Sequence, residues 1–139
     1  MKIYSVIDTN VIISAMLKQS SIPGLVLEYA LSGIIIPVLN KEIVSEYRTV
    51  LMREKFHLNT KIVNNLIQTL EYYGEYIEPE QLNIELPDPK DIIFYEVVME
   101  KKKENMTYLV TGNIKHFPSE PFIVTPRQLI NILNENSVK

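Results

Sequence analysis

The sequence predicts an α/β fold in which helices cover both faces of a parallel β-sheet. Short runs rich in Ile, Val and Tyr alternate along the chain with longer amphipathic segments, a pattern typical of a parallel sheet buried on both faces. The chain has 139 residues and no cysteine. A domain of this length can bury a sufficient core without disulfides, so we expect one domain over residues 1–139.

The first strand and the two helices after it are indicated by periodicity and by capping residues. Residues 2–7 alternate loosely between apolar and polar side chains, which predicts a strand. The residues that follow predict a short helix over 10–18. Ser21 is a favourable N-cap and Pro23 fits the first turn of a helix, so a second helix is expected over residues 21–32, where a glycine follows.

The middle of the chain predicts one strand and two helices. Residues 34–39, "IIIPVL", form a continuous apolar run of the kind found in buried strands. Asn40 can cap the next helix, which we expect over residues 40–54. A further helix begins at Asn59 or Thr60 and runs to residue 73, where a glycine again follows.

The last part of the chain predicts further strands that alternate with two helices. Residues 76–79 are a weak strand candidate, and a loop leads into a helix over 89–103. Residues 107–112, "TYLVTG", predict a strand that ends in a glycine turn, and residues 122–125 predict another strand. Pro126 opens a final helix.

Polar residues follow two of these strands directly. Asp8 interrupts two apolar runs at the end of the first strand, and Asn113 follows "TYLVTG". Ligands of parallel sheets bind at the carboxyl ends of strands, where the strand order reverses. Two alternatives stay open: Asp8, Thr9 or Asn10 could cap a helix, and Asn113 could serve the turn alone.

Three further acids are expected at the same edge of the sheet. The chain has fourteen glutamates but only three aspartates, so each aspartate should hold a specific position as a cap or a ligand. Asp88 and Asp91 lie in "DPKD", which also fits a capping box. Glu46 borders a helical apolar stripe and could instead be an ion-paired boundary residue; that stripe comprises Ile43, Tyr47, Val50 and Leu51.

Carboxylates that converge without cysteine or histidine favour a hard cation, Mg²⁺ or Mn²⁺. Such clusters serve phosphoryl chemistry, because the cation neutralises phosphate charge and stabilises the attacking and leaving oxygens. The net charge of −3 argues against a nucleic-acid binder that works by bulk positive charge. No apolar run approaches the roughly 18 residues of a membrane span, and no signal peptide is evident, so we expect a cytoplasmic protein.

Four stretches of the chain resemble a known family in their order and spacing: "VIDTNVIISAM", "NKEIVSEYRTVLMREKF", "LPDPKDIIFYEVVME" and "YLVTGNIKHFP". Together they resemble PIN-domain proteins, and more narrowly the bacterial, VapC-like toxins of toxin–antitoxin systems. The resemblance implies a three-layer α/β/α sandwich with a central parallel sheet of about five strands. It also implies a Mg²⁺- or Mn²⁺-dependent endoribonuclease with an RNA substrate and a cognate antitoxin protein. A homodimer is compatible with the sequence, which does not fix the oligomeric state.

The acids of the family carry over residue by residue. They match Asp8 of "DTN", Glu46 of "SEY" and Asp91 of "DPKD", which the resemblance implies as catalytic residues and metal ligands. The fourth acidic position, after "TG", holds Asn113 instead, which removes one negative charge. The residues implied in substrate contact or in support of the acids are Thr9, Asn10, Thr111, Asn113 and Lys115.

Other classes of function compete with a metal-dependent nuclease. A non-catalytic PIN-like module that binds RNA or a protein is the main alternative, with Asn113 as its sign. Phosphotransfer receivers and dehalogenase-like phosphatases need an acidic pair or Asp-x-Asp, and "IDTNV" fits neither. Residues 101–103, "KKK", are expected to form a solvated helix end, and His116 is not expected to be a metal ligand or a general base.

Overall fold

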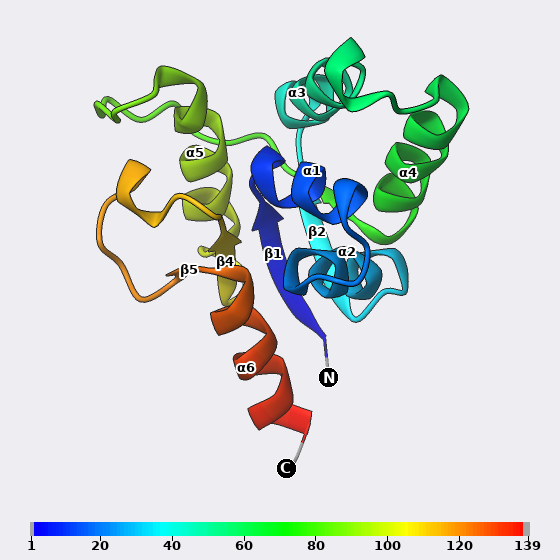
Figure 1. Ribbon diagram of the computed structural model, residues 1–139. Helices are drawn as coiled ribbons and strands as arrows, with labels where there is room; N and C mark the ends of the chain where they lie inside the picture. The colour runs from blue at the N-terminus through cyan, green and yellow to red at the C-terminus, as the bar shows by residue number, and fades with distance from the viewer. Residues whose placement is uncertain (1, 138–139) are drawn as a thin grey trace.

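The structure is a computed structural model that describes residues 2–137. It confirms the α/β fold, with five strands and six α-helices (Figure 1). The strands are β1 (Ile3–Ile7), β2 (Ile35–Leu39), β3 (Glu75–Tyr76), β4 (Thr107–Val110) and β5 (Ile123–Val124). The helices are α1 (Thr9–Leu17), α2 (Ile22–Leu31), α3 (Lys41–Leu51), α4 (Thr60–Tyr73), α5 (Ile92–Lys101) and α6 (Pro126–Ser137). Three short 3₁₀ helices are η1 (Glu54–Phe56), η2 (Pro89–Asp91) and η3 (Ile114–His116).

The five strands form one parallel sheet in the order β3-β2-β1-β4-β5. The chain builds outward from β1 through β2 to β3, and then returns to the other side of β1 with β4 and β5. The strand order therefore reverses between β1 and β4. In their register Ile7 lies opposite Val110, so both strands end at the same level and the residues after them become neighbours.

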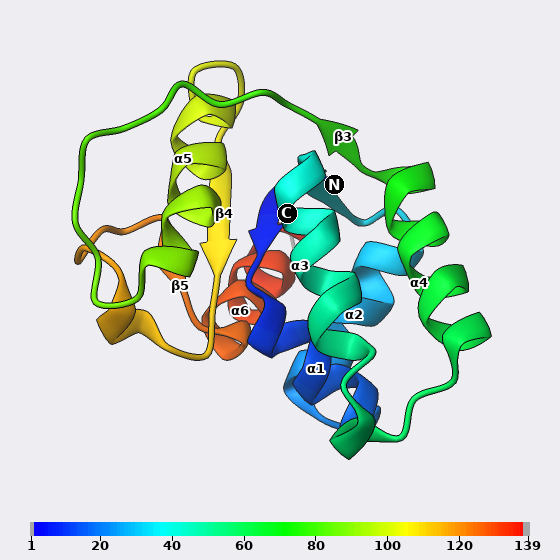
Figure 2. The ribbon, with the colours of Figure 1, turned by 90° about the horizontal axis from the view of Figure 1, so that it is seen from above.

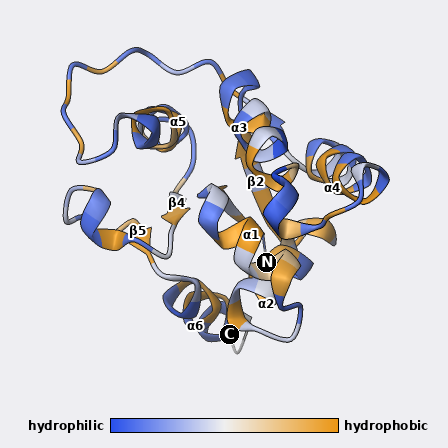
Figure 3. Ribbon diagram, turned by 45° about the horizontal axis from the view of Figure 1, so that its top comes forward, coloured by the Kyte–Doolittle hydropathy of each residue, from blue (hydrophilic) through white to orange (hydrophobic). Residues whose placement is uncertain are grey.

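Helices cover both faces of the sheet, as predicted for a three-layer sandwich. Figure 3 shows α3 and α5 on one side of the strands and α2 and α6 on the other. Helix α5 packs on β1, β2 and β4, whereas α6 packs on β4 and β5. The apolar side chains of β1 and β2 form the centre of the core, with Val6, Ile35, Val38 and Leu39 all fully buried.

A long connection joins the two halves of the sheet. Figure 2 shows the segment between β3 and η2 following an outer path to the start of α5. Two carboxylates of α5 hold it in place: Glu96 Oε2 accepts a hydrogen bond from the backbone N–H of Leu82 (2.7 Å), and Glu100 Oε1 accepts one from Glu80 (2.9 Å). Glu96 is buried, so this attachment lies partly inside the fold.

Within residues 2–137 no single helix is long and apolar enough to cross a membrane. Helices α1 and α2 reach that length and composition only as a pair, and the pair is bent by 104° at its break.

The predicted helices and strands are all present, and their boundaries differ for local reasons. The helix predicted over 89–103 is a 3₁₀ turn over Pro89–Asp91 followed by α5 over Ile92–Lys101. Asn40 caps α3 through its Oδ1, which accepts a hydrogen bond from the Ile43 N–H (2.9 Å). The helix predicted to reach residue 54 ends at Leu51, because Arg53 has an extended backbone (φ −61°, ψ 133°). The strand predicted over 76–79 is only Glu75–Tyr76, because its partner β2 ends at Leu39, which pairs with Tyr76.

The prediction that "KKK" forms a solvated helix end is wrong for its first residue. The Lys101 side chain is only 5% exposed, and its Nζ pairs with Glu75 Oε1 (2.7 Å) and Glu104 Oε2 (2.9 Å). The same ammonium lies 4.6 Å from the centroid of the Tyr4 ring. Lys101 therefore joins the end of α5 to β1 and β3 instead of facing solvent.

Replacing Lys101 by alanine should lower the free energy of unfolding by about 2 kcal/mol, because a buried side chain and its pairing are both lost. The matched control is Lys103→Ala. Lys103 is 58% exposed in its ion pair with Glu100, and exposed pairs contribute little. Urea unfolding of both variants measures the difference. Equal losses in the two variants would contradict a structural role specific to Lys101.

Candidate functional site

The candidate site begins at Asp8, which lies directly after β1. Its backbone N–H donates to the Val110 carbonyl (2.9 Å), which extends the β1–β4 pairing by one residue. Asp8 occupies the N-cap position of α1, yet its side chain makes no capping hydrogen bond. The residue is only 5% exposed, and its carboxylate accepts instead from Thr111 Oγ1 (2.7 Å). The alternative that Asp8 serves only as a helix cap is therefore wrong.

A small hydrogen-bond network connects the ends of β1 and β4. Asn10 Nδ2 donates to Asp8 Oδ2 (3.3 Å), and Asn10 Oδ1 accepts from the Gly112 N–H (3.1 Å). Thr111 Oγ1 in turn accepts from the Asn113 N–H (2.9 Å). The first residues of α1 and the loop after β4 are thus bound together around one carboxylate, at the point where the strand order reverses.

Burial raises the pKa of Asp8 to about 6. The hydrogen bond from Thr111 and the neighbouring backbone N–H of Thr9 lower that pKa, whereas the charges of Asp91 and Glu46 raise it. The two other predicted acids therefore lie close enough to act on Asp8 electrostatically. The charged form of Asp8 is disfavoured here unless a positive charge is brought into the site.

Asp91 lies at the junction of η2 and α5. Its side chain is 13% exposed, and Oδ2 is 3.3 Å from Nδ1 of His116. Burial raises the pKa of Asp91, with further contributions from Asp88 and Glu46, while His116 lowers it. Asp88 does act as a cap, since its Oδ1 accepts from the Lys90 N–H (3.0 Å), but Asp91 makes no capping hydrogen bond.

Glu46 reaches the site from α3. The neighbouring Tyr47 is buried, and its hydroxyl donates to the Ile7 carbonyl (2.5 Å), which fixes α3 against the end of β1. Glu46 is half-buried and raises the pKa of both Asp8 and Asp91. No salt bridge between described residues involves Glu46, so the ion-paired alternative finds no support in residues 2–137.

The remaining predicted residues occupy different parts of this edge. Thr9 is buried, and its Oγ1 has no hydrogen-bond partner in the described part of the chain. Asn113 and Lys115 are exposed on the loop after β4. The backbone of Asn113 is not left-handed (φ −124°, ψ 66°), so a left-handed turn does not account for this asparagine.

His116 is the residue that sequence reasoning missed. It was expected near the edge of the site as a possible phosphate contact, but not against an acid, and its Nδ1 lies 3.3 Å from Oδ2 of Asp91. The sequence feature that could have indicated its position is the aromatic residue that follows it, Phe117. Phe117 is buried, and a loop anchored by a buried aromatic residue holds the side chains next to the anchor in place.

The acids suit a hard cation by their chemistry but are not assembled around one. Among residues 2–137 no group of three or more His, Cys, Asp or Glu side chains is close enough to hold a metal ion. Two observations nevertheless favour a cation: Asp8 and Asp91 have raised pKa values, and the charge of Glu46 contributes to both of these shifts. Carboxylate oxygens are the ligands that Mg²⁺ and Mn²⁺ prefer.

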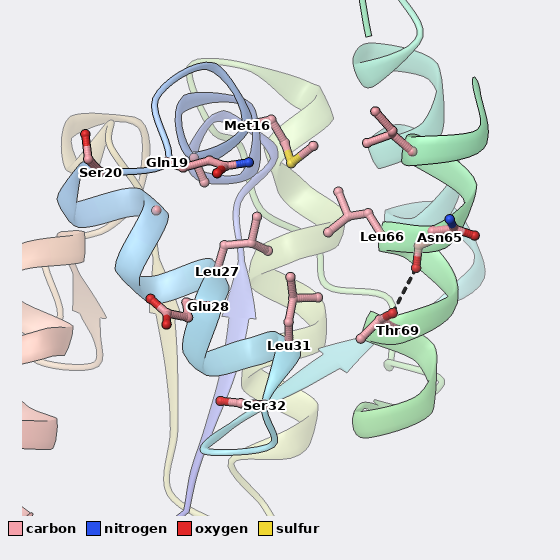
Figure 4. A pocket seen from close by; sticks show the side chains of 13 residues that line it. Met16, Gln19, Ser20, Leu27, Glu28, Leu31, Ser32, Asn65, Leu66 and Thr69 are labelled. Carbon is pink, nitrogen blue, oxygen red and sulfur yellow. Dashed lines mark hydrogen bonds between the residues drawn. The ribbon is translucent and has the colours of Figure 1, made fainter. Parts of the chain in front are cut away.

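Two larger cavities are not lined by Asp8, Glu46 or Asp91. A polar cavity of about 650 Å³ lies between the connection after β3 and the beginnings of α3 and α5, and Glu42, Asn83 and Ile93 are among the residues that line it. A cleft of about 870 Å³ lies between α2 and α4 (Figure 4). In Figure 4 Leu27 and Leu31 of α2 face Leu66 of α4 across this cleft. None of the three acids lines it.

In metal-free buffer, Asp8→Asn should stabilise the protein at pH 8 and lose this advantage near pH 4. The pKa of Asp8 rises from 3.8 to about 6 on folding, so the folded state binds more protons between these values and loses stability as the pH rises. Asparagine removes this loss, a gain of about 1–3 kcal/mol at pH 8. Urea unfolding in EDTA at several pH values measures it. A gain that does not change with pH would contradict the burial of an ionised Asp8.

Comparison with known proteins agrees with this geometry. The sequence model of the family described as PIN domain matches residues 4–115, a range that begins in β1 and ends in η3. It therefore includes Asp8, Glu46, Asp91 and Thr111. No curated protein matches the chain. Because the match covers most of the chain, the protein belongs to the PIN domain family, whose members are commonly nucleases and typically bind divalent metals.

Proposed function

We propose that this protein is an endoribonuclease that depends on Mg²⁺ or Mn²⁺ and hydrolyses RNA phosphodiester bonds. One observation carries the proposal: a buried carboxylate, Asp8, lies at the reversal of the strand order with Asp91 and Glu46 acting on it. The charges of Asp91 and Glu46 both raise the pKa of the buried Asp8, which is costly to the fold when Asp8 is ionised, and a divalent cation offsets that cost.

In this proposal Asp8 and Asp91 hold the cation, and Glu46 either ligates it or positions the attacking water. When bound, the cation neutralises charge on the phosphate and on the oxygens that attack and leave. Thr111 and Asn10 keep Asp8 in one orientation through their hydrogen bonds, as residues behind a metal ligand commonly do.

The exposed residues of the loop after β4 are proposed to contact RNA. Lys115 is exposed and can meet a phosphate, and Asn113 lies beside Thr111 through its backbone hydrogen bond. A local contact of this kind needs no net positive charge on the whole protein, whose net charge is −3.

A non-catalytic PIN-like module that binds RNA or a protein is the second candidate. Two observations favour it: Asn113 replaces the usual acid, and no preassembled metal group exists among the described residues. The two candidates differ in one measurement, because only the first predicts RNA cleavage that depends on the three acids.

We further propose a cytoplasmic toxin that is held inactive by an antitoxin protein. The cleft between α2 and α4 supports a protein partner, because it is largely apolar and Ile62 at its border is 51% exposed. Such a surface suits an apolar helix face. Induced expression in a bacterial host tests this role. Growth arrest that co-expression of a small protein encoded next to this one relieves would support the role, and unimpaired growth would count against it.

Purified protein should cleave RNA in Mg²⁺ or Mn²⁺, and EDTA should abolish cleavage. Asp8→Asn and Asp91→Asn should each reduce the rate by orders of magnitude, because each removes a charged ligand. The assay follows cleavage of labelled RNA over time, with thermal unfolding as a check on folding.

Asp88→Asn is the matched control for Asp91→Asn. Asp88 caps η2 through Lys90, and asparagine caps equally well, so this variant should cleave nearly as fast as wild type. Robust cleavage in EDTA would exclude the mechanism. An inactive Asp88→Asn beside an active Asp91→Asn would show that the ligand in "DPKD" is misassigned.

Asn113→Asp should bind Mn²⁺ more tightly than wild type in the absence of RNA, because affinity for divalent cations rises with the charge of the ligands. Calorimetric titration of wild type, Asn113→Asp and Asn113→Ala measures this. Equal affinity in all three proteins would place Asn113 outside the metal site, where alanine could affect only the stability of the loop.

A further inference from the structure

The contact between His116 and Asp91 is not explained by the fold alone. Nδ1 of His116 lies 3.3 Å from Oδ2 of Asp91. Oδ2 is buried, and no hydrogen bond of standard geometry reaches it from the described residues. A buried carboxylate oxygen without a partner is costly. Nδ1 of the imidazole is the polar atom that lies against this oxygen.

The local backbone does not fix the carboxylate of Asp91. The residue stands at the N-cap of α5, but its own conformation is helical (φ −80°, ψ −14°) and its side chain makes no capping hydrogen bond. Asp88 performs the capping of the preceding turn. The orientation of Asp91 therefore depends on a side chain from another element.

His116 is well placed to supply that orientation, because its own backbone is held on both sides. The His116 N–H donates to the Asn113 carbonyl (3.0 Å), and the Phe117 N–H donates to the Ile114 carbonyl (3.1 Å). Asn113 is bound in turn to Thr111, and Phe117 is buried in the core. The imidazole thus projects from a turn that is tied to the same network as Asp8.

We propose that His116 is a positioning residue for Asp91. Its Nδ1–H holds Oδ2, which leaves Oδ1 as the oxygen available to a divalent cation. The inference rests on the proposed function, since it assigns a role toward the same site. Groups that hydrogen-bond to a ligating side chain commonly change metal affinity by about 10–100-fold when they are removed.

Three variants separate this role from a general effect on the fold. His116→Phe keeps a ring but removes the N–H donor, and His116→Asn restores a donor, Nδ2, at the position of Nδ1. His57→Asn is the matched control. His57 is exposed and has a left-handed backbone (φ 52°), which asparagine tolerates.

Calorimetric titration with Mn²⁺, without RNA, is the first readout. His116→Phe should bind at least about tenfold more weakly than wild type, whereas His116→Asn and His57→Asn should bind like wild type. RNA cleavage is the second readout: excess Mn²⁺ should restore cleavage by His116→Phe but not by Asp91→Asn, because only the latter lacks a ligand. If His116→Phe does not unfold cooperatively in EDTA, His116→Ala takes its place.

Two results would overturn the inference while leaving the proposed function intact. The first is wild-type Mn²⁺ affinity in His116→Phe. The second is an equal loss in His116→Asn and His116→Phe, which would make the imidazole itself the required group. A wild-type protein that neither binds Mn²⁺ nor cleaves RNA would overturn the proposed function, and the inference with it, in a measurement that involves no variant.

Discussion

The hydrogen bond from Thr111 to Asp8 joins the two central strands beyond the point where their backbone pairing ends. Several features of the molecule depend on it. It lowers the pKa of Asp8, which burial alone would raise further. It also holds Oδ2 of Asp8, the oxygen that Asn10 contacts as well. Through the Asn113 N–H it reaches the loop that carries His116. The hydroxyl of Thr111 therefore links the end of β1, the end of β4 and the loop that follows β4.

The two other acids reach this point on helices that the core holds in place. Tyr47 attaches α3 to the carbonyl of Ile7, the residue before Asp8, and its ring lies 6.4 Å from that of Phe94 in α5. Both aromatic side chains are nearly fully buried. The positions of Glu46 and Asp91 are thus set by packing between α3, α5 and β1, and their mutual repulsion is opposed by the apolar core beneath them.

Much of this arrangement could be predicted from the sequence, because its signals are local. Ser21, Asn40 and Asn59 all cap the helices that they were expected to begin. The placement of Asp8 after a buried strand followed from the alternation of apolar runs and helices. Lys101 could not be predicted in this way, since its burial depends on Glu75, which is 26 residues away in the chain. The contact of His116 with Asp91 could not be predicted for the same reason, because it forms only once β4 and α5 have packed together.

The order of the strands has a consequence for how the protein folds during its synthesis. β1 is made first, yet one of its two neighbours in the sheet is β4, which begins at residue 107. Chains emerge from the ribosome in sequence, and pairings between distant segments form late. Asp8 and Glu46 are therefore synthesised long before Thr111 can join them. The acids of a growing chain therefore stay apart, and the proposed nuclease would become active only after β4 and the loop that follows it have been synthesised.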